Sequence, residues 1–246
     1  MEWFFNFPDM SRSDLREFKK TVDFAFTDFS RSYGAEIEGF FEPLLMFLVW
    51  FEKFFINTPW PLIIFGILVL AWIGSRSIPV VIGTFLSFML IGYFGMWEDT
   101  MSTLAIILVA TFLCISIGIP MGIAMARSNK VQAVIVPVLD VMQTIPSFVY
   151  LIPVVMLLGI GKVPGLIAVC IYAIPPIVRL TNLGIRLVDK DVLEAADSFG
   201  ANYWQKLFGV QMPLALPTIF AGVNQTIMMA LAMVCLLYTS PSPRDS

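Results

Sequence analysis

Residues 188–208 read "VDKDVLEAADSFGANYWQKLF", a charged stretch inside an otherwise apolar chain. It holds six charged side chains, whereas the preceding 134 residues, 54–187, hold nine. Asp191 can cap a first short helix, Glu194 is placed to reach back to that cap, and Gly200 suits the left-handed residue that ends it. Asn202 with Gln205 repeats the arrangement for a second helix, which Pro213 is expected to close. The stretch predicts two short polar helices around a glycine turn.

The composition of the whole chain predicts a membrane protein. Apolar residues make up 58% and charged residues 13%, against about 45–50% and 25% in soluble domains. The 246 residues can supply several spanning helices of about 20 residues each, with little room for a soluble domain. We therefore expect an all-α, polytopic membrane fold. The chain has no histidine, which excludes histidine-based catalysis, and its three cysteines show no metal-binding spacing. A net charge of -3 without a basic cluster argues against a nucleic-acid partner.

Apolar segments and basic loops predict how the chain crosses the bilayer. A transmembrane domain is expected over residues 58–234, with spans at 58–74, 78–97, 101–126, 131–158, 163–182 and 214 to about 237. An excess of Lys and Arg marks cytoplasmic loops, which places Arg76, Arg127 with Lys130, and the polar insert at residues 183–213 inside the cell. Only Lys162 departs from this pattern, because it lies in a loop predicted outside the cell.

Residues 1–57 form a polar but phenylalanine-rich extension. Ser11 and Asp14 can cap a helix whose apolar residues recur every three or four positions, at Leu15, Phe18, Val22, Phe26, Phe29, Tyr33 and Ile37. This stripe packs either on the protein itself or into the membrane interface. Residues 44–56 carry Glu52 and Lys53 and either lie at the interface or cross the bilayer. The N-terminus is external in the first case and internal in the second.

Prolines predict two interrupted spans that line a cavity: residues 131–158, with Pro146 and Pro153, and residues 163–182, with Pro175 and Pro176. Asp140 lies about nine residues, or about 14 Å, inside its span. It is a functional candidate, unless it makes a structural hydrogen bond to a neighbouring helix or its segment enters the membrane later. Further candidates for a translocation pathway are the polar residues Gln143, Thr144, Ser147, Asn224 and Gln225.

The polar insert also offers a contact surface. Ala195 and Ala196 permit close approach, and large apolar side chains commonly carry interface energy, here Phe199, Trp204, Leu207 and Phe208. The insert is therefore either a docking element or a well-capped loop packed only on its own protein.

The spacing of the insert resembles the "EAA" signature of permease subunits in binding-protein-dependent ABC importers. The matching positions are Glu194, Ala195, Ala196, Gly200, Val210, Met212 and Pro213, with Val210 and Met212 in place of the usual Ile and Leu. The resemblance implies a type I importer permease fold in which these residues form the coupling helix that docks the ATP-binding subunit. Runs over about residues 78–234, among them "IYAIPPIVRLTNLGI", are similar to permeases for glycine betaine, proline betaine and related osmolytes. The N-terminal extension also resembles a segment that some of these permeases carry.

This resemblance implies a transmembrane permease subunit in the bacterial inner membrane. Its expected partners are a second permease copy, two ATP-binding subunits, and a substrate-binding protein or fused domain. The chain shows no G-x-x-x-x-G-K-[ST] loop, so ATP and Mg are expected in the partner, with no cofactor and no enzymatic activity in this chain. The alternatives are a type I importer permease for a different small solute and an ion-coupled secondary transporter that uses Asp140.

After Val234 the resemblance stops. Residues 235–246 read "CLLYTSPSPRDS" and look like a translated sequencing adapter, which predicts a non-native tail; the alternative is a genuine short polar tail. Its serines and prolines cannot continue a helix.

Overall fold

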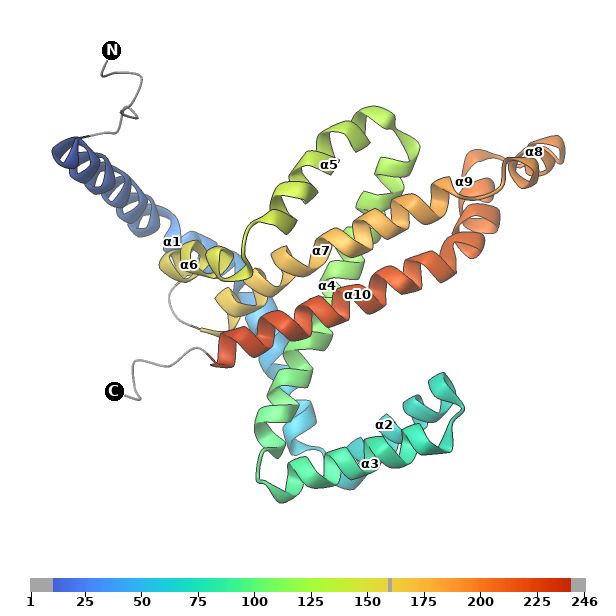
Figure 1. Ribbon diagram of the computed structural model, residues 1–246, viewed down its shortest axis with the longest axis horizontal. Coiled ribbons are helices and arrows are strands. Elements are labelled where there is room, and N and C mark those ends of the chain that lie inside the picture. Colours follow the sequence, from blue (N-terminus) through green and yellow to red (C-terminus); the bar gives the residue numbers. More distant parts are fainter. Residues whose placement is uncertain (1–10, 159–160, 240–246) are drawn as a thin grey trace, which may run out of the picture.

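The computed structural model describes residues 11–158 and 161–239, and all regular elements within these ranges are helical. This confirms the expected all-α class. The α-helices, drawn in Figure 1, are α1 (Arg12–Asn57), α2 (Trp60–Ser75), α3 (Ile78–Tyr93), α4 (Trp97–Arg127), α5 (Asn129–Thr144), α6 (Ser147–Leu158), α7 (Lys162–Arg186), α8 (Lys190–Ser198), α9 (Tyr203–Lys206) and α10 (Met212–Thr239).

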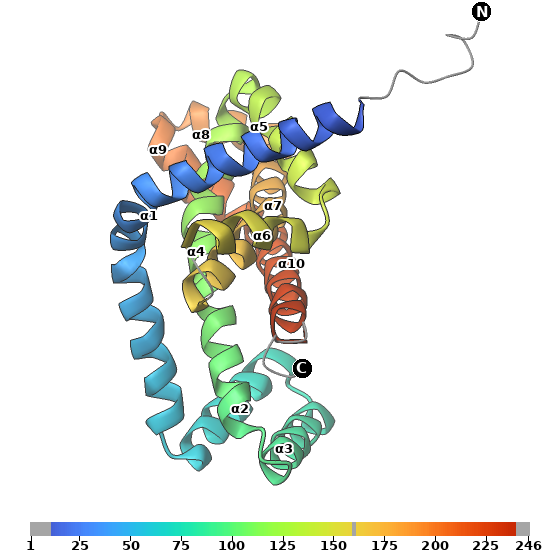
Figure 2. The same ribbon diagram turned by 90° about the vertical axis from the view of Figure 1, so that its left-hand side faces the viewer.

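The core forms where α4 and α10 pack on α7, the most buried helix. Figures 1 and 2 show α7 and α10 side by side and α4 crossing them. Two glycines one turn apart on α4 make this approach possible. A Cβ atom at Gly118 would lie 2.4 Å from the Ile177 side chain, and one at Gly122 would lie 2.5 Å from Thr181 Cβ. Small residues let helix backbones meet closely within a bilayer, where packing drives helix association.

Three helical segments are long and apolar enough to cross a membrane by themselves: Trp97–Arg127, Lys162–Arg186 and Tyr203–Cys235. The prediction of independent spans at residues 58–74 and 78–97 is not met. Helices α2 and α3 have 16 residues each, which is about 24 Å at 1.5 Å per residue and short of a bilayer core of about 30 Å. Helix α2 passes the same criterion only together with Gly39–Asn57, to which it is bent by 103°.

The predicted span at residues 131–158 is interrupted, as expected. It divides into α5 and α6, which meet at 95°. The break lies at Ile145, whose extended backbone precedes Pro146, because a residue before proline disfavours the helical conformation. The predicted interruption of residues 163–182 is wrong. Pro175 and Pro176 are buried inside the continuous helix α7, where packing from α4 and α10 maintains the helix.

Helix α1 begins as the sequence predicts, with the Ser11 hydroxyl oxygen accepting the Asp14 N–H at 3.2 Å. It changes direction along its length, as Figure 2 shows. In its first turns Leu15, Phe18 and Val22 are exposed with respect to the described residues. The remaining side chains of the predicted stripe, those of Phe26, Phe29, Tyr33 and Ile37, lie outside the described part of the structure. Residues 44–57 belong to the same helix, and Leu48 is fully buried there.

Candidate docking site

The insert at residues 183–213 folds into two short helices around Gly200, whose φ of 74° is the left-handed conformation predicted for it. The predicted cap at Asp191 is wrong. Asp189 caps α8 instead, its carboxylate accepting the Asp191 N–H at 3.0 Å. Glu194 is therefore the fifth residue of α8 rather than the third, too far along the helix to complete a capping box.

The second helix starts as predicted and ends differently. The Asn202 side chain accepts the Gln205 N–H at 2.9 Å, and the Gln205 side chain accepts the Asn202 N–H at 2.8 Å. Pro213 does not close this helix, because the chain continues through a π-helical turn (Leu207–Gln211) into α10. Proline suits the first turn of a helix, and Pro213 is the second residue of α10. One continuous segment, Tyr203–Cys235, therefore joins the insert to the core.

Two arginines connect the insert to the rest of the protein. The sequence predicted Arg127 only as a marker of a cytoplasmic loop, and Arg186 was not predicted as a contact residue. The Arg127 guanidinium lies 4.0 Å from the ring centre of Tyr203 and 5.4 Å from that of Trp204, within cation–π range. Arg186 donates to the backbone carbonyl of Met125 at 2.8 Å and to the Asn129 side chain at 2.9 Å. These contacts hold the start of the insert and α9 against the turn between α4 and α5.

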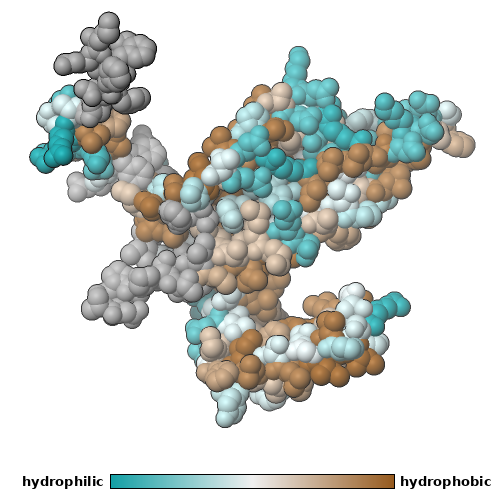
Figure 3. Space-filling view, in the orientation of Figure 1, coloured by the Kyte–Doolittle hydropathy of each residue, from teal (hydrophilic) through white to brown (hydrophobic). Residues whose placement is uncertain are grey.

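The outer face of the insert is mixed polar and apolar, as Figure 3 shows around α8. Phe199 is 92% exposed, and Trp204 and Phe208 stack on each other while remaining more than half exposed. Leu207 was expected on this surface but is buried, because it anchors the π-helical turn. Of the seven signature positions, Glu194, Ala195, Gly200 and Pro213 are exposed, and Ala196, Val210 and Met212 are half-buried.

Lys206 on α9 holds the two short helices together. Its ammonium group lies 2.6 and 2.8 Å from the two carboxylate oxygens of Asp197 on α8. The insert is thus a braced unit with an exposed aromatic face.

The candidate pathway residues fall into two groups on opposite sides of α7. Asp140, Gln143 and Thr144 are exposed on α5, and Asn224 and Gln225 are exposed on α10. Ser147 opens α6. Helices α5 and α10 each pack on α7, which lies between them in Figures 1 and 2. Within this chain the fold does not bring the two groups together.

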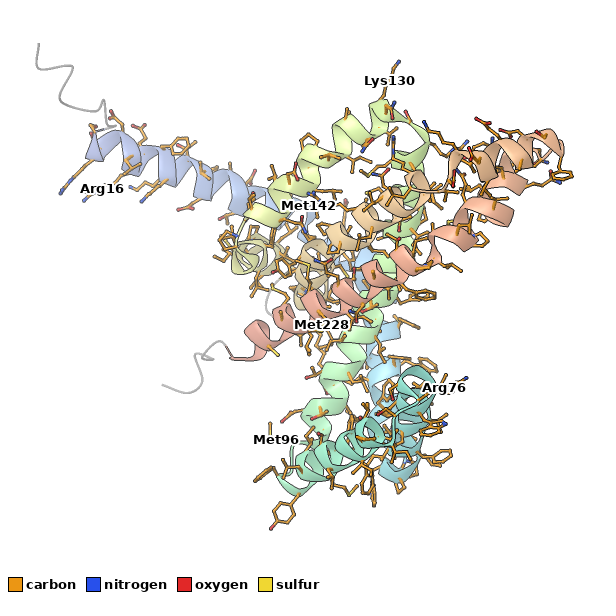
Figure 4. The ribbon with its side chains drawn as sticks, turned by 45° about the vertical axis from the view of Figure 1, so that its right-hand side comes forward. Arg16, Arg76, Met96, Lys130, Met142 and Met228 are labelled. Carbon is orange, nitrogen blue, oxygen red and sulfur yellow. The ribbon has the colours of Figure 1, made fainter. Side chains whose placement is uncertain are left out.

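Asp140 has a partner on a neighbouring helix. From the sequence, such a structural hydrogen bond was the alternative to a functional role. Arg179 of α7, which the sequence reading did not select, donates to the Asp140 carboxylate at 2.5 Å. Across the α5–α6 break, the Tyr150 hydroxyl donates to the Met142 carbonyl at 2.6 Å; Figure 4 labels Met142 near this bend. Among the described residues, no group of three or more His, Cys, Asp or Glu side chains could hold a metal ion.

Residues 118–239 match the family described as binding-protein-dependent transport system inner membrane component. The chain belongs to this family. The match includes the whole of α7, the insert and α10, so the resemblance based on the EAA spacing is confirmed. The chain is accordingly part of a multi-pass protein of the bacterial inner membrane, as expected.

The chain is similar to several proteins of betaine transport systems. It is 48% identical over 199 residues to the glycine betaine/proline betaine transport system permease protein of Escherichia coli, covering 81% of this chain and 56% of that one. It is 47% identical over 180 residues to a glycine betaine/carnitine transport permease protein of Listeria monocytogenes, covering 72% and 64%. A glycine betaine transport system permease protein of Bacillus subtilis is 45% identical over 165 residues, covering 67% and 58%. The chain thus spans less than two thirds of the length of each of these relatives.

Proposed function

We propose that this chain is the transmembrane subunit of an ATP-driven importer for glycine betaine, proline betaine and similar quaternary-amine osmolytes. The observation that carries the proposal is the braced insert with its exposed aromatic face, at the position of the family's EAA signature. The betaine substrates of the three relatives support the substrate class.

In this proposal the insert receives movement from an ATP-binding subunit. The small residues Ala195 and Ala196 allow the partner to approach α8 closely, and Phe199 provides apolar contact area. A displacement of α9 passes directly into α10, because residues Tyr203–Cys235 form one helical segment. The same displacement reaches α4 and α5 through Arg127, whose guanidinium lies over the α9 aromatic rings.

The partners follow from this assignment. ATP hydrolysis and its Mg belong to two ATP-binding subunits, and this chain itself is not an enzyme. A second permease copy supplies the other half of the pathway, which would allow the polar side chains of α5 and α10 to meet across the two copies. These pathway residues are Asp140, Gln143, Thr144, Ser147, Asn224 and Gln225. A substrate-binding protein or fused domain delivers the osmolyte.

Co-purification with the ATP-binding subunit tests the docking step. Phe199→Ser should abolish co-purification, because it removes the most exposed aromatic side chain of the insert without touching the core. Phe24→Ser is the matched control, since Phe24 is 75% exposed on α1, far from the insert in sequence. Equal retention of the ATP-binding subunit by both variants and the unaltered chain would contradict the proposed docking surface.

A further inference from the structure

A cavity of about 620 Å³ lies outside the docking site, where the end of α1 and the start of α2 meet the end of α3 and the start of α4. Its size falls within the range of roughly 300–1,000 Å³ typical of small-molecule sites. In Figure 4 the labelled Met96 marks the α3–α4 turn beside it, and Arg76 marks the opposite end of α3.

The wall of the cavity is apolar and aromatic. Ile56, Ile64, Phe88 and Met89 contribute hydrocarbon surface, and its aromatic residues with a polar edge are Trp60, Tyr93 and Trp97. Trp97 is half-buried and meets the edge of Phe88 with ring centres 6.3 Å apart. Asn57 and Thr58 are the polar side chains of the lining besides these aromatic groups, and no charged residue lines it. A ligand for this wall is therefore mostly hydrocarbon.

The depth of the cavity in the bilayer indicates which hydrocarbon compound is available to fill it. Helices α2 and α3 are about 24 Å long and shorter than the bilayer core. Trp and Tyr side chains favour the level of the lipid headgroups, and Trp60, Tyr93 and Trp97 gather at one end of this helix pair. A cavity at that level opens towards both the headgroups and the acyl chains. The apolar surface of the α2–α3 pair is visible in Figure 3.

We propose that this cavity binds one phospholipid of the surrounding bilayer, with an acyl chain against Ile64, Phe88 and Met89 and the polar end towards Asn57 and Thr58. The lipid joins the α2–α3 pair to α1 and α4. A quaternary-amine osmolyte could contact the rings of Trp60, Tyr93 and Trp97, but it fits less well than a lipid because so small a polar molecule would leave most of the hydrocarbon wall uncovered. The inference rests on the membrane location of the family and is independent of the proposed substrate.

Two glycines of α3 provide a matched test. A Cβ atom at Gly92 or at Gly83 would meet no atom within 4 Å, so both helix positions accept a larger side chain. Gly92 lines the cavity and Gly83 does not. Gly92→Leu should fill the cavity, whereas Gly83→Leu adds the same side chain elsewhere on the helix. Met89→Phe is a second filling variant in case Gly92→Leu does not fold, and it adds no tryptophan to the protein.

The binding experiment uses the full chain in detergent micelles, with the two lining residues Trp60 and Trp97 as its remaining tryptophans and a phosphatidylcholine brominated along its acyl chain as quencher. We expect saturable quenching of this tryptophan fluorescence, with a midpoint raised at least about tenfold by Gly92→Leu, or about 1.4 kcal/mol, and unchanged by Gly83→Leu. Native mass spectrometry of the unaltered protein should show one retained phospholipid per chain. Non-saturable quenching that is equal in all variants, or quenching that glycine betaine abolishes, would overturn the proposal.

Discussion

The Lys162 ammonium group lies 2.6 Å from both carboxylate oxygens of Glu52, a residue 110 positions earlier in the chain. The Ser102 hydroxyl donates to the same carboxylate at 2.6 Å. These contacts join α1, α4 and α7 at one point. They also explain why Lys162 departs from the charge pattern of the loops, since its charge is compensated by a carboxylate that is only 10% exposed.

Lys162→Met should destabilise the protein, because it leaves the buried Glu52 carboxylate without its cation. Breaking a buried pair costs about 3–5 kcal/mol, and we expect about 1–3 kcal/mol here because Lys162 is 45% exposed and partly screened. The midpoint of thermal unfolding in detergent measures the loss. The double variant Glu52→Met with Lys162→Met should recover most of it, and a double variant less stable than the single one would contradict this account.

The close packing of α4 on α7 predicts that a glycine-to-alanine substitution destabilises the protein at Gly122 but not at Gly66. Gly122→Ala should cost about 1–3 kcal/mol, because the new Cβ atom would lie 2.5 Å from Thr181 Cβ and 2.8 Å from the Val178 carbonyl oxygen. Gly66→Ala on α2 meets no atom within 4 Å and should change stability by at most about 1 kcal/mol. Thermal unfolding of the two variants side by side checks the difference. A stable Gly122→Ala protein would mean that α4 and α7 pack less closely than described.

Substitutions of Gly200 test whether coupling depends on the backbone geometry of the turn in the insert. Gly200→Val places a β-branched residue at a φ of 74°, which costs roughly 1–2 kcal/mol and favours a different turn. In a reconstituted complex with the ATP-binding and substrate-binding partners, substrate should no longer increase the rate of ATP hydrolysis when this variant is used. Gly200→Asn should retain most of this increase, because asparagine tolerates the left-handed conformation. Equal activity of both variants would show that the turn geometry does not matter for coupling.

A charge swap tests the role of the Asp140–Arg179 pair. Asp140→Arg and Arg179→Asp should each impair uptake by placing like charges together, and the double variant should restore it. Stability should change by no more than about 1 kcal/mol on loss of the pair, since both side chains are at least 36% exposed. Uptake rates of the three variants provide the measurement. A double variant no better than the single ones would indicate that the carboxylate itself is required, as in an ion-coupled carrier.

Local signals in the sequence predicted local structure well. Ser11, Gly200 and the Asn202–Gln205 capping box all occupy the predicted roles, because each depends on hydrogen bonds or backbone angles within a few residues. The choice of Asp191 over Asp189 was wrong because both aspartates stand before the same short helix, and only the final backbone path decides which one caps it.

Long-range relationships were not predictable in the same way. Arg127 and Tyr203 are 76 positions apart, and Arg179 and Asp140 are 39 apart, so no sequence period connects them. Proline also had opposite consequences at different sites. Pro146 follows a residue in extended conformation at a helix break, whereas Pro175 and Pro176 lie buried within a continuous helix. Neighbouring helices decide between these outcomes, and a single sequence does not contain that information.

Uptake of labelled glycine betaine into proteoliposomes tests the central claim most directly. The vesicles contain this chain together with its ATP-binding and substrate-binding partners, and ATP and a protonophore are varied independently. We predict uptake that requires ATP, persists with the protonophore and is lost in Phe199→Ser. Uptake that proceeds without the ATP-binding subunit and collapses with the protonophore would contradict the account.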